Sequence, residues 1–258
     1  MFLPVIPLTF YLTRVGSQVQ FRELSPFGSA MDTSGIQLII PACNAEKHLP
    51  ELLREVVEYI PPDQIILVDD GSVDRSGEVG RAFGLKVVRH VENYGKGMAL
   101  RSGIRLARES PDFRATIFMD ADGQHDPASV PRFVREFEIT GADLILGYRR
   151  RDAGGMPGIR RLSNFVTSFL ISLRVAHSIR DSQCGYRLVS RNLADRVETD
   201  LNGSQAETEL LIKAMDLRCS ISQIRIPTIY GEEASHIKPL QDIVDFTMLC
   251  LRSFFYNL

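Results

Sequence analysis

Two acidic residues separated by one position, Asp120 and Asp122, form the strongest chemical signal in the sequence. They follow an apolar run, and side chains two positions apart on an extended chain point the same way. Paired carboxylates suit Mg²⁺ or Mn²⁺, and the nearby Gln124 adds an amide oxygen. We therefore predict that Asp120 and Asp122 hold a divalent ion that binds a diphosphate. The alternative is an acidic loop that only caps a helix, the role we expect for Asp126. His125 fits a metal ligand and a structural hydrogen-bonding residue equally.

A second acidic segment, Asp69-Asp70-Gly71-Ser72, also follows an apolar run. Its tight turn would expose acceptors for the N–H of a nucleobase or the hydroxyls of a ribose. Capping of the next helix by Ser72 or Asp74 is the alternative. The glycine-rich segment Asn93–Gly97 precedes another helix and suits phosphate binding through backbone N–H groups. It lacks the P-loop and dinucleotide-binding patterns, so a plain turn also explains it.

Basic residues cluster in the second half of the chain, at Arg149–Arg151, at Arg160-Arg161, and at His236 and Lys238. A solvated charged face explains such clusters, but they also suit a phosphate of a nucleotide or of an acidic lipid headgroup. The formal net charge is only −2, from 30 basic and 32 acidic residues. Anion binding is therefore local, and nucleic acid is not an expected partner.

Short apolar runs alternate with helical patterns and predict the elements that position these residues. This alternation is typical of a mostly parallel sheet with helices on both faces, an α/β fold. Ligands bind at the carboxyl ends of the strands in such sheets. Both acidic segments lie at strand ends, as do Pro41, Ala42 and Asn44. The predicted strands are Ile36–Cys43, Ile65–Val68, Lys86–His90, Thr116–Met119 and Asp143–Gly147.

The alternation changes after residue 150. Arg160–Ala176 and Leu240–Tyr256 are predicted amphipathic helices, which fit either core packing or the membrane interface. Ser178–Ser190 is predicted to be a polar connection, Gln205–Leu217 a helix and Ile221–Tyr230 a strand. No apolar run reaches the length of about 20 residues that a membrane-spanning helix needs.

The chain is expected to have three parts: a poorly ordered extension (1–34), a catalytic domain (35–235), and a C-terminal loop with an amphipathic helix (236–258). The first residues lack the basic region and cleavage site of a signal peptide, and we hypothesise that translation begins at Met31. The four cysteines are scattered without metal-ligand spacing. They favour free thiols in a reducing compartment over a zinc site or a disulfide scaffold.

Six motifs follow one another along the chain: Ile40–Glu46, Val68–Asp74, Asn93–Gly97, Met119–His125, Asp181–Arg187 and Glu207–Glu209. In this order they resemble glycosyltransferase family 2. The sequence looks most like the branch that transfers sugars to dolichyl or other polyprenyl phosphates, over residues 36–245. The resemblance implies a GT-A fold, a nucleotide-diphosphate sugar donor and Mg²⁺ or Mn²⁺, with Asp120, Asp122 and Gln124 on the metal and the diphosphate.

The resemblance also implies roles for individual residues. Asp122, Asp181 and Arg149 are expected to be catalytic, with Asp181 near the acceptor. Arg160, Arg161 and Lys238 are expected to bind the acceptor phosphate. The first motif departs from the family pattern, because Cys43 replaces an aromatic residue and Ala45 separates the acid from the asparagine. The expected nucleotide-sugar contacts are Pro41, Ala42, Asn44, Glu46, Asp69, Asp70, Gly71, Lys96, Asp120, Ala121, Asp122, Gln124, Arg149 and Lys238.

We therefore expect an inverting glycosyltransferase that moves a hexosyl unit from a nucleotide-diphosphate sugar to polyprenyl or dolichyl phosphate. Transfer to a hydroxyl of a saccharide or another soluble acceptor is an alternative that requires a base, for which Asp181 is the candidate. A non-catalytic GT-A scaffold and a sugar nucleotidyltransferase are further alternatives. The expected location is cytoplasmic, peripheral on the cytoplasmic membrane face, where a separate anchoring protein is a candidate partner.

Overall fold

The computed structural model describes residues 10–15, 18–23, 32–149, 168, 172, 178–203, 205–227 and 229. Apart from Ser168 and Ser172, the two predicted amphipathic helices lie outside these residues. The chain divides into two units, Met1–Asp32 and Thr33–Leu258. In the first unit, β1 (Phe10–Val15) and β2 (Gln18–Glu23) form an antiparallel pair that the sequence pattern did not indicate. The expectation of a poorly ordered extension stays a prediction.

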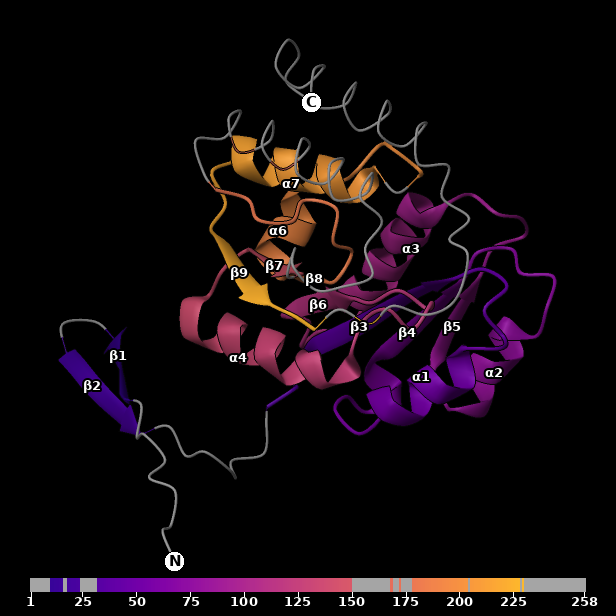
Figure 1. Ribbon diagram of the computed structural model, residues 1–258, viewed down its shortest axis with the longest axis horizontal. Helices are drawn as coiled ribbons and strands as arrows, with labels where there is room; N and C mark the ends of the chain where they lie inside the picture. The colour runs from indigo at the N-terminus through magenta and orange to yellow at the C-terminus, as the bar shows by residue number, and fades with distance from the viewer. Residues whose placement is uncertain are drawn as a thin grey trace, which may run out of the picture. The chain divides into compact units, whose positions relative to one another are not determined.

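The second unit is built on a seven-stranded sheet in the order β5-β4-β3-β6-β8-β7-β9 (Figure 1). All neighbours pair in parallel except β8, which runs antiparallel to both β6 and β7. The sheet confirms the predicted α/β class. Its strands are β3 (Ile36–Ala42), β4 (Ile65–Asp69), β5 (Lys86–Arg89), β6 (Ala115–Phe118), β7 (Leu144–Tyr148), β8 (Arg187–Ser190) and β9 (Ile221–Arg225).

The central strands are buried on both faces, which explains why they read as continuous apolar runs. All five residues of β4 are buried, whereas the edge strand β5 is exposed or half-buried along its length. Ile39, Ile66 and Phe118 belong to the core on one side of the sheet. Each such side chain contributes about 1.5–3 kcal/mol of burial free energy, so the central strands fix the framework of the site.

Helices cover both faces of the sheet, as predicted (Figure 1). One face carries α1 (Leu49–Val56), α2 (Ser76–Ala82) and α4 (Val130–Thr140). The other carries α3 (Lys96–Arg108), α6 (Arg191–Arg196) and α7 (Ala206–Asp216). Within the described part of the chain, none of the helices is both long and apolar enough to span a membrane.

Strand β8 corrects the prediction of a purely polar connection over Ser178–Ser190. Its four residues are all buried, but it begins with Arg187, and a charged first residue hides the strand from a search for apolar runs. Because β8 runs opposite to its neighbours, its start lies at the edge of the sheet where β6 and β7 end. The segment that precedes β8 is therefore delivered to the same edge as the acidic loop after β6.

Candidate active site

The loops that follow β3 and β4 are bonded to each other at this edge. The backbone N–H of Asn44 donates to Ser72 Oγ at 2.9 Å, and that of Ala45 donates to Ser76 Oγ at 2.8 Å. In return, Asn44 Oδ1 accepts from the backbone N–H of Val73 at 2.9 Å. Asn44 adopts a positive φ of 53°, which asparagine tolerates better than most residues. The predicted Asn44 position is thus a rigid corner of the site.

Glu46, predicted to contact the nucleotide sugar, pairs with the neighbouring loop. Its Oε1 accepts from Arg75 Nε at 2.7 Å, and its Oε2 accepts from the backbone N–H of Arg75 at 3.1 Å. These bonds lower the pKa of Glu46. Gly71 packs so closely on the 92–93 backbone that a β-carbon would stand 2.3 Å from the carbonyl carbon of Glu92. Both residues therefore hold loops together, and their contact with a donor stays a prediction.

The acidic pair after β4 points inward. Asp69 is fully buried, and its Oδ1 accepts from the N–H of Ser72 at 3.0 Å. Asp70 is 4% exposed and accepts three bonds, from the backbone N–H groups of Tyr94 and Gly95 and from His90 Nδ1. The structure thus uses this pair to organise the protein's own turns, and direct contact of Asp69 or Asp70 with a nucleotide stays a prediction.

A charged cluster lies where β6 ends. Lys96, the first residue of α3, places its Nζ 2.5 Å from Asp120 Oδ1 and 3.1 Å from Glu207 Oε1. Burial pushes the pKa of Lys96 down, but the charges of Asp120 and Glu207 outweigh it and raise that pKa. Burial likewise pushes the pKa of Asp120 up, but the charge of Lys96 lowers it to about 2. Lys96 and Asp120 therefore stay charged at neutral pH.

Asp122 and Gln124 complete the predicted metal-binding set. The N–H of Gln124 donates to Asp122 Oδ1 at 2.9 Å. Asp122 is an exposed residue, yet loss of water around its carboxyl and the negative charge of Asp120 raise its pKa. Two carboxylates that disfavour each other's charge fit a divalent cation, which relieves the repulsion.

The described residues also limit how such an ion is held. Among them, no group of three or more histidine, cysteine or acidic side chains is arranged to hold a metal ion. Mg²⁺ in nucleotide sites usually takes one or two protein carboxylates and completes its shell with phosphate oxygens and water. The donor set of Asp120 and Asp122 therefore fits an ion shared with a diphosphate.

His125, for which the sequence left two roles open, is a structural hydrogen-bonding residue. Its Nδ1 accepts from the backbone N–H of Asp120 at 3.0 Å, and its ring stacks on Tyr186 with the centroids 4.8 Å apart. Burial lowers the pKa of His125 from 6.5 to about 4. The neutral ring thus fixes the backbone at the end of β6, and with it the carboxylate of Asp120.

This buried histidine predicts a specific loss of stability in acid. Between about pH 6.5 and pH 4 the unfolded chain binds a proton at His125 that the folded protein does not bind, so stability falls as pH falls. The pKa difference corresponds to about 3 kcal/mol. We expect His125→Asn, which retains an acceptor, to be less stable than the parent at pH 7 but to lose less stability on going to pH 4. Urea unfolding at several pH values measures this, and parallel pH curves for the two proteins would contradict it.

Arg149 and Asp181, both predicted to be catalytic, form an ion pair between a half-buried guanidinium and a buried carboxylate. Arg149 Nε donates to Asp181 Oδ2 at 2.8 Å, and Arg149 Nη2 donates to Asp181 Oδ1 at 3.2 Å. Asp181 is 1% exposed. The charge of Arg149 also helps to lower the pKa of Asp120, which places this pair beside the charged cluster. The structure therefore brings Lys96, Asp120, Arg149 and Asp181 into one electrostatic neighbourhood.

Two charged residues of this neighbourhood were absent from the predicted site. Glu207, which lies at the start of α7, is 5% exposed, and among the described residues its Oε1 has no hydrogen-bond partner besides the ionic contact with Lys96. Arg187 is fully buried and donates to three backbone carbonyls, those of Ser182, Cys184 and Glu207. The only sequence signal for either residue was its place in a motif of the family resemblance, because neither follows an apolar strand of the predicted parallel series.

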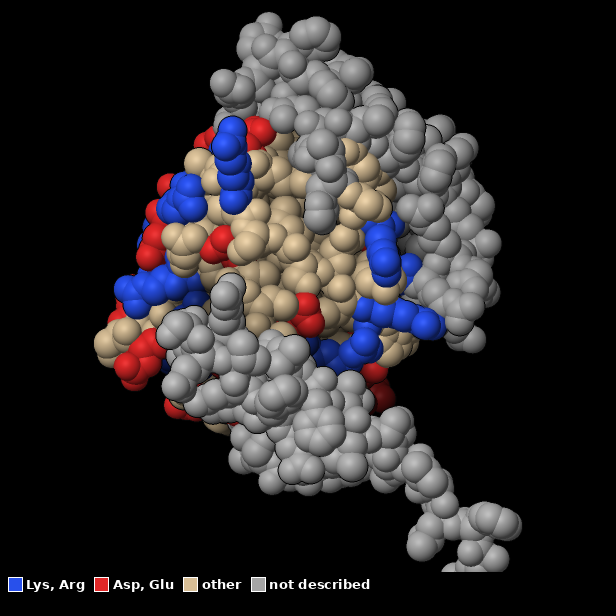
Figure 2. All heavy atoms as spheres, turned by 90° about the vertical axis from the view of Figure 1, so that its left-hand side faces the viewer, with Lys and Arg blue, Asp and Glu red and all other residues tan. Residues whose placement is uncertain are grey.

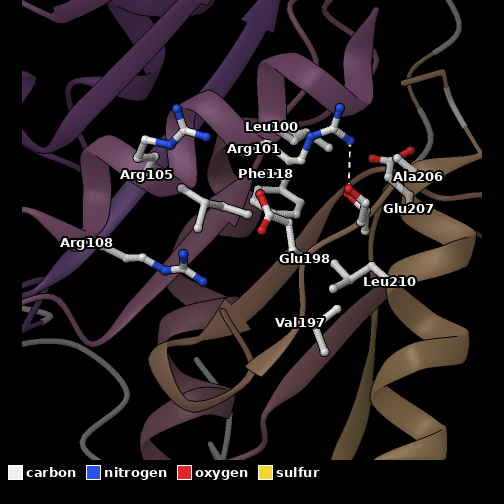
Figure 3. A pocket seen from close by; sticks show the side chains of 12 residues that line it. Leu100, Arg101, Arg105, Arg108, Phe118, Val197, Glu198, Ala206, Glu207 and Leu210 are labelled. Carbon is white, nitrogen blue, oxygen red and sulfur yellow. Dashed lines mark hydrogen bonds between the residues drawn. The ribbon is translucent and has the colours of Figure 1, made fainter. Parts of the chain in front are cut away.

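A small cavity of about 40 Å³ lies behind Glu207, between α3 and the segment that leads into α7 (Figure 3). Arg101, Arg105 and Arg108 line it from α3. Arg101 joins α3 to the segment before α7, because its Nη1 donates to the carbonyls of Thr199 and Leu201 at 2.9 and 2.8 Å. The cavity therefore borders the charged cluster at Glu207, whereas Lys96 and Asp120 do not line it.

The remaining basic residues of the predicted site, Arg160, Arg161 and Lys238, lie outside the described residues. On the face of the molecule shown in Figure 2, Lys and Arg side chains of the described part gather toward the margins, and the centre is mostly uncharged with a few acidic side chains among it. This distribution agrees with a nearly neutral chain whose electrostatic action is local.

The comparison with protein families shows which family the chain belongs to. The model of glycosyl transferase family 2 matches residues 37–197. The chain belongs to glycosyl transferase family 2. That span includes β3, β4, α3 and the loop with Asp120 and Asp122, so the family match covers most of the site described above. Membership excludes the sugar nucleotidyltransferase alternative.

Relatives of this glycosyltransferase are found among curated proteins and solved structures. It is 34% identical to an uncharacterized protein of Methanocaldococcus jannaschii over 202 residues, covering 76% of this chain and 82% of that protein. It is 29% identical to UDP-N-acetylglucosamine--dolichyl-phosphate N-acetylglucosaminyltransferase of Methanococcus voltae, with coverage of 76% and 86%. Glucosyl-3-phosphoglycerate synthase of Mycobacterium tuberculosis superposes with a TM-score of 0.67 at 24% identity, covering 87% of this chain and 81% of that one. This likeness confirms the predicted GT-A fold.

Proposed function

We propose that this glycosyltransferase moves a hexosyl unit from a nucleotide-diphosphate sugar to polyprenyl or dolichyl phosphate, with inversion at the anomeric carbon. The name of the Methanococcus voltae relative gives a UDP-sugar donor and a dolichyl phosphate acceptor. The synthase of similar fold was crystallised with Mn²⁺ and UDP. Both support the donor and cation classes proposed for this chain.

The charged cluster would bind the donor. Asp120 and Asp122 would hold Mg²⁺ or Mn²⁺, which, when bound, supplies charge neutralisation for the diphosphate leaving group. Lys96, whose raised pKa keeps it cationic, lies 2.5 Å from Asp120 and is placed to bind a phosphate oxygen of the same diphosphate. Arg149, also beside this cluster, would add positive charge as the leaving group departs.

One observation favours a phosphate acceptor over a hydroxyl acceptor. A hydroxyl needs a general base, but the carboxylate of the candidate base, Asp181, is almost fully buried and accepts three bonds from Arg149, two from its guanidinium and one from its backbone N–H. A phosphate is already an anion near neutral pH and attacks without losing a proton. Positioning and charge stabilisation then carry the rate, and Asp181 serves by orienting Arg149.

The acceptor would reach the site from a membrane surface. Arg160, Arg161 and Lys238 are proposed to bind its phosphate, and the two predicted amphipathic helices would lie in the interface of the cytoplasmic leaflet. The enzyme would then be a peripheral protein of the membrane, alone or with a separate anchoring protein.

Transfer assays with the purified full chain test this function. The protein is incubated with labelled UDP-glucose, UDP-N-acetylglucosamine or GDP-mannose, Mn²⁺, and either polyprenyl phosphate in detergent or soluble 3-phosphoglycerate. We expect label in the organic phase with at least one donor, only when polyprenyl phosphate is present and only until EDTA is added. Product from the soluble acceptor alone would overturn the lipid assignment while preserving the glycosyltransferase.

A further inference from the structure

A partly buried chain of hydrogen bonds links three side chains that the chemistry above does not use. His90 Nδ1 lies 2.6 Å from Asp70 Oδ1, and His90 Nε2 lies 2.9 Å from Ser102 Oγ. Because an ionised carboxylate only accepts, Nδ1 donates to Asp70. The side chains of His90 and Asp70 are 10% and 5% exposed, so solvent competes little for these bonds.

The chain of bonds meets the start of α3 at two points. Asp70 Oδ1 accepts from the N–H of Tyr94 at 3.0 Å, and Asp70 Oδ2 accepts from the N–H of Gly95 at 2.8 Å. Ser102 lies on α3 itself, within the helix whose first residue is Lys96. This chain of bonds, which we call the Asp70–His90–Ser102 relay, is therefore bonded at one end to the turn before Lys96 and at the other end to the helix that Lys96 begins.

A third contact restricts the position of this turn. Gly95 has a φ of 92°, and a β-carbon there would stand 2.5 Å from the carbonyl oxygen of Asn202. The next glycine, Gly97, donates its N–H to the same oxygen at 2.6 Å. The turn is thus enclosed by the 201–202 segment on one side and by Asp70 and His90 on the other.

We propose that Asp70, His90 and Ser102 are positioning residues for donor binding, which act by fixing where Lys96 meets Asp120. This inference rests on the proposed function, because it takes the donor diphosphate as the ligand of Lys96. Asp70 already accepts three hydrogen bonds from the protein and is almost fully buried. Its effect on binding of the nucleotide sugar therefore passes through the 93–97 turn.

A double-mutant cycle tests the route through Lys96. The variants are His90→Leu, Lys96→Met and the double variant, and the probes are UDP and GDP with Mn²⁺, measured by calorimetry. We expect each single variant to weaken nucleotide affinity by about 10-fold, which is about 1.4 kcal/mol. The double variant should bind no more weakly than Lys96→Met, because the relay acts only through the lysine. If the losses in nucleotide affinity of the two single variants multiply in the double variant, the proposal is wrong.

Two further variants separate positioning from general stability. His90→Asn retains an N–H donor near Nδ1 and is expected to recover most of the nucleotide affinity. Asp143→Asn is the matched control, since Asp143 bonds Ser190, Asn192 and Ser220 before β7, away from this turn. It should lower stability without changing nucleotide affinity.

Hydrogen exchange distinguishes failure of this inference from failure of the proposed function. The amides of Tyr94 and Gly95 should exchange at least 10-fold faster in His90→Leu, and at the parent rate in Asp143→Asn. If the parent protein binds neither nucleotide, the proposed donor class is wrong. Amide exchange alone then tests whether the relay fixes the turn before Lys96. Unchanged exchange at both amides in His90→Leu would overturn it.

Discussion

Asp122→Asn is expected to lower kcat/KM for sugar transfer by about 1,000-fold while leaving the fold intact. The substitution removes one of two carboxylates that would share the divalent ion, and the lost charge stabilisation of the leaving group is worth about 4 kcal/mol. Asp122 is exposed, and its one described side-chain bond is from the N–H of Gln124, which an amide oxygen also accepts. Stability should therefore hardly change. Steady-state transfer assays and thermal unfolding measure the two effects.

Asp126→Asn is the control in the same loop. Asp126 Oδ1 accepts from the N–H of Ala128, and this confirms its predicted role at the start of a helix. Asparagine caps as well as aspartate does, so the control keeps its activity within about twofold. Equal losses in the two variants would show that loop charge, rather than the Asp120 and Asp122 pair, supports the reaction.

Arg187→Leu is expected to destabilise the protein by about 4 kcal/mol. The guanidinium is fully buried and donates to Cys184 O at 2.7 Å, to Ser182 O at 2.6 Å and to Glu207 O. Leucine would leave three buried carbonyl oxygens without donors, each at a cost of about 1–3 kcal/mol before relaxation. Urea unfolding of the parent and the variant measures the difference in free energy.

The same arginine ties the segment before β8 to the start of α7. Its loss would therefore also release Glu207 from Lys96, and donor affinity should fall together with stability. Arg191→Leu serves as control, because Arg191 is exposed and its bonds to Pro111 and Phe113 carbonyls are long, at 3.5 and 3.3 Å. That control should cost about 0.5 kcal/mol. A loss below 1 kcal/mol for Arg187→Leu would show that water replaces the guanidinium.

The framework of this fold was predictable because its central strands are buried on both faces. Five apolar runs coincide, within a residue or two, with β3, β4, β5, β6 and β7. Strand β8 and helix α6 were missed, since β8 is short and begins with a charged residue. Arg187 can be buried at the start of β8 because three backbone carbonyls accept its hydrogen bonds. That tertiary arrangement does not follow from local periodicity.

The candidate site was predictable where chemistry follows from spacing along the chain. The separation of Asp120 and Asp122 by one residue led to the prediction of a shared ion, and burial together with the carboxylate of Asp120 does raise the pKa of Asp122, although the ion itself stays a prediction. The direction in which a carboxylate turns was not predictable, and Asp69 and Asp70 turn into the protein rather than toward the edge. Partners from distant segments, such as Lys96 and Glu207, meet only after α3 and α7 pack together.

Gly185 has a consequence for how this centre tolerates change. A β-carbon at this position would lie 2.8 Å from Glu207 Oε1, 2.8 Å from Lys96 Nζ and 3.0 Å from Asp120 Oδ2. All three atoms are ends of movable side chains, so even a single methyl group would be admitted by pushing the charges apart rather than by breaking the backbone. The fold would thus survive a change at Gly185 that the charged cluster would not, because the absence of a side chain there is what lets Lys96, Asp120 and Glu207 meet.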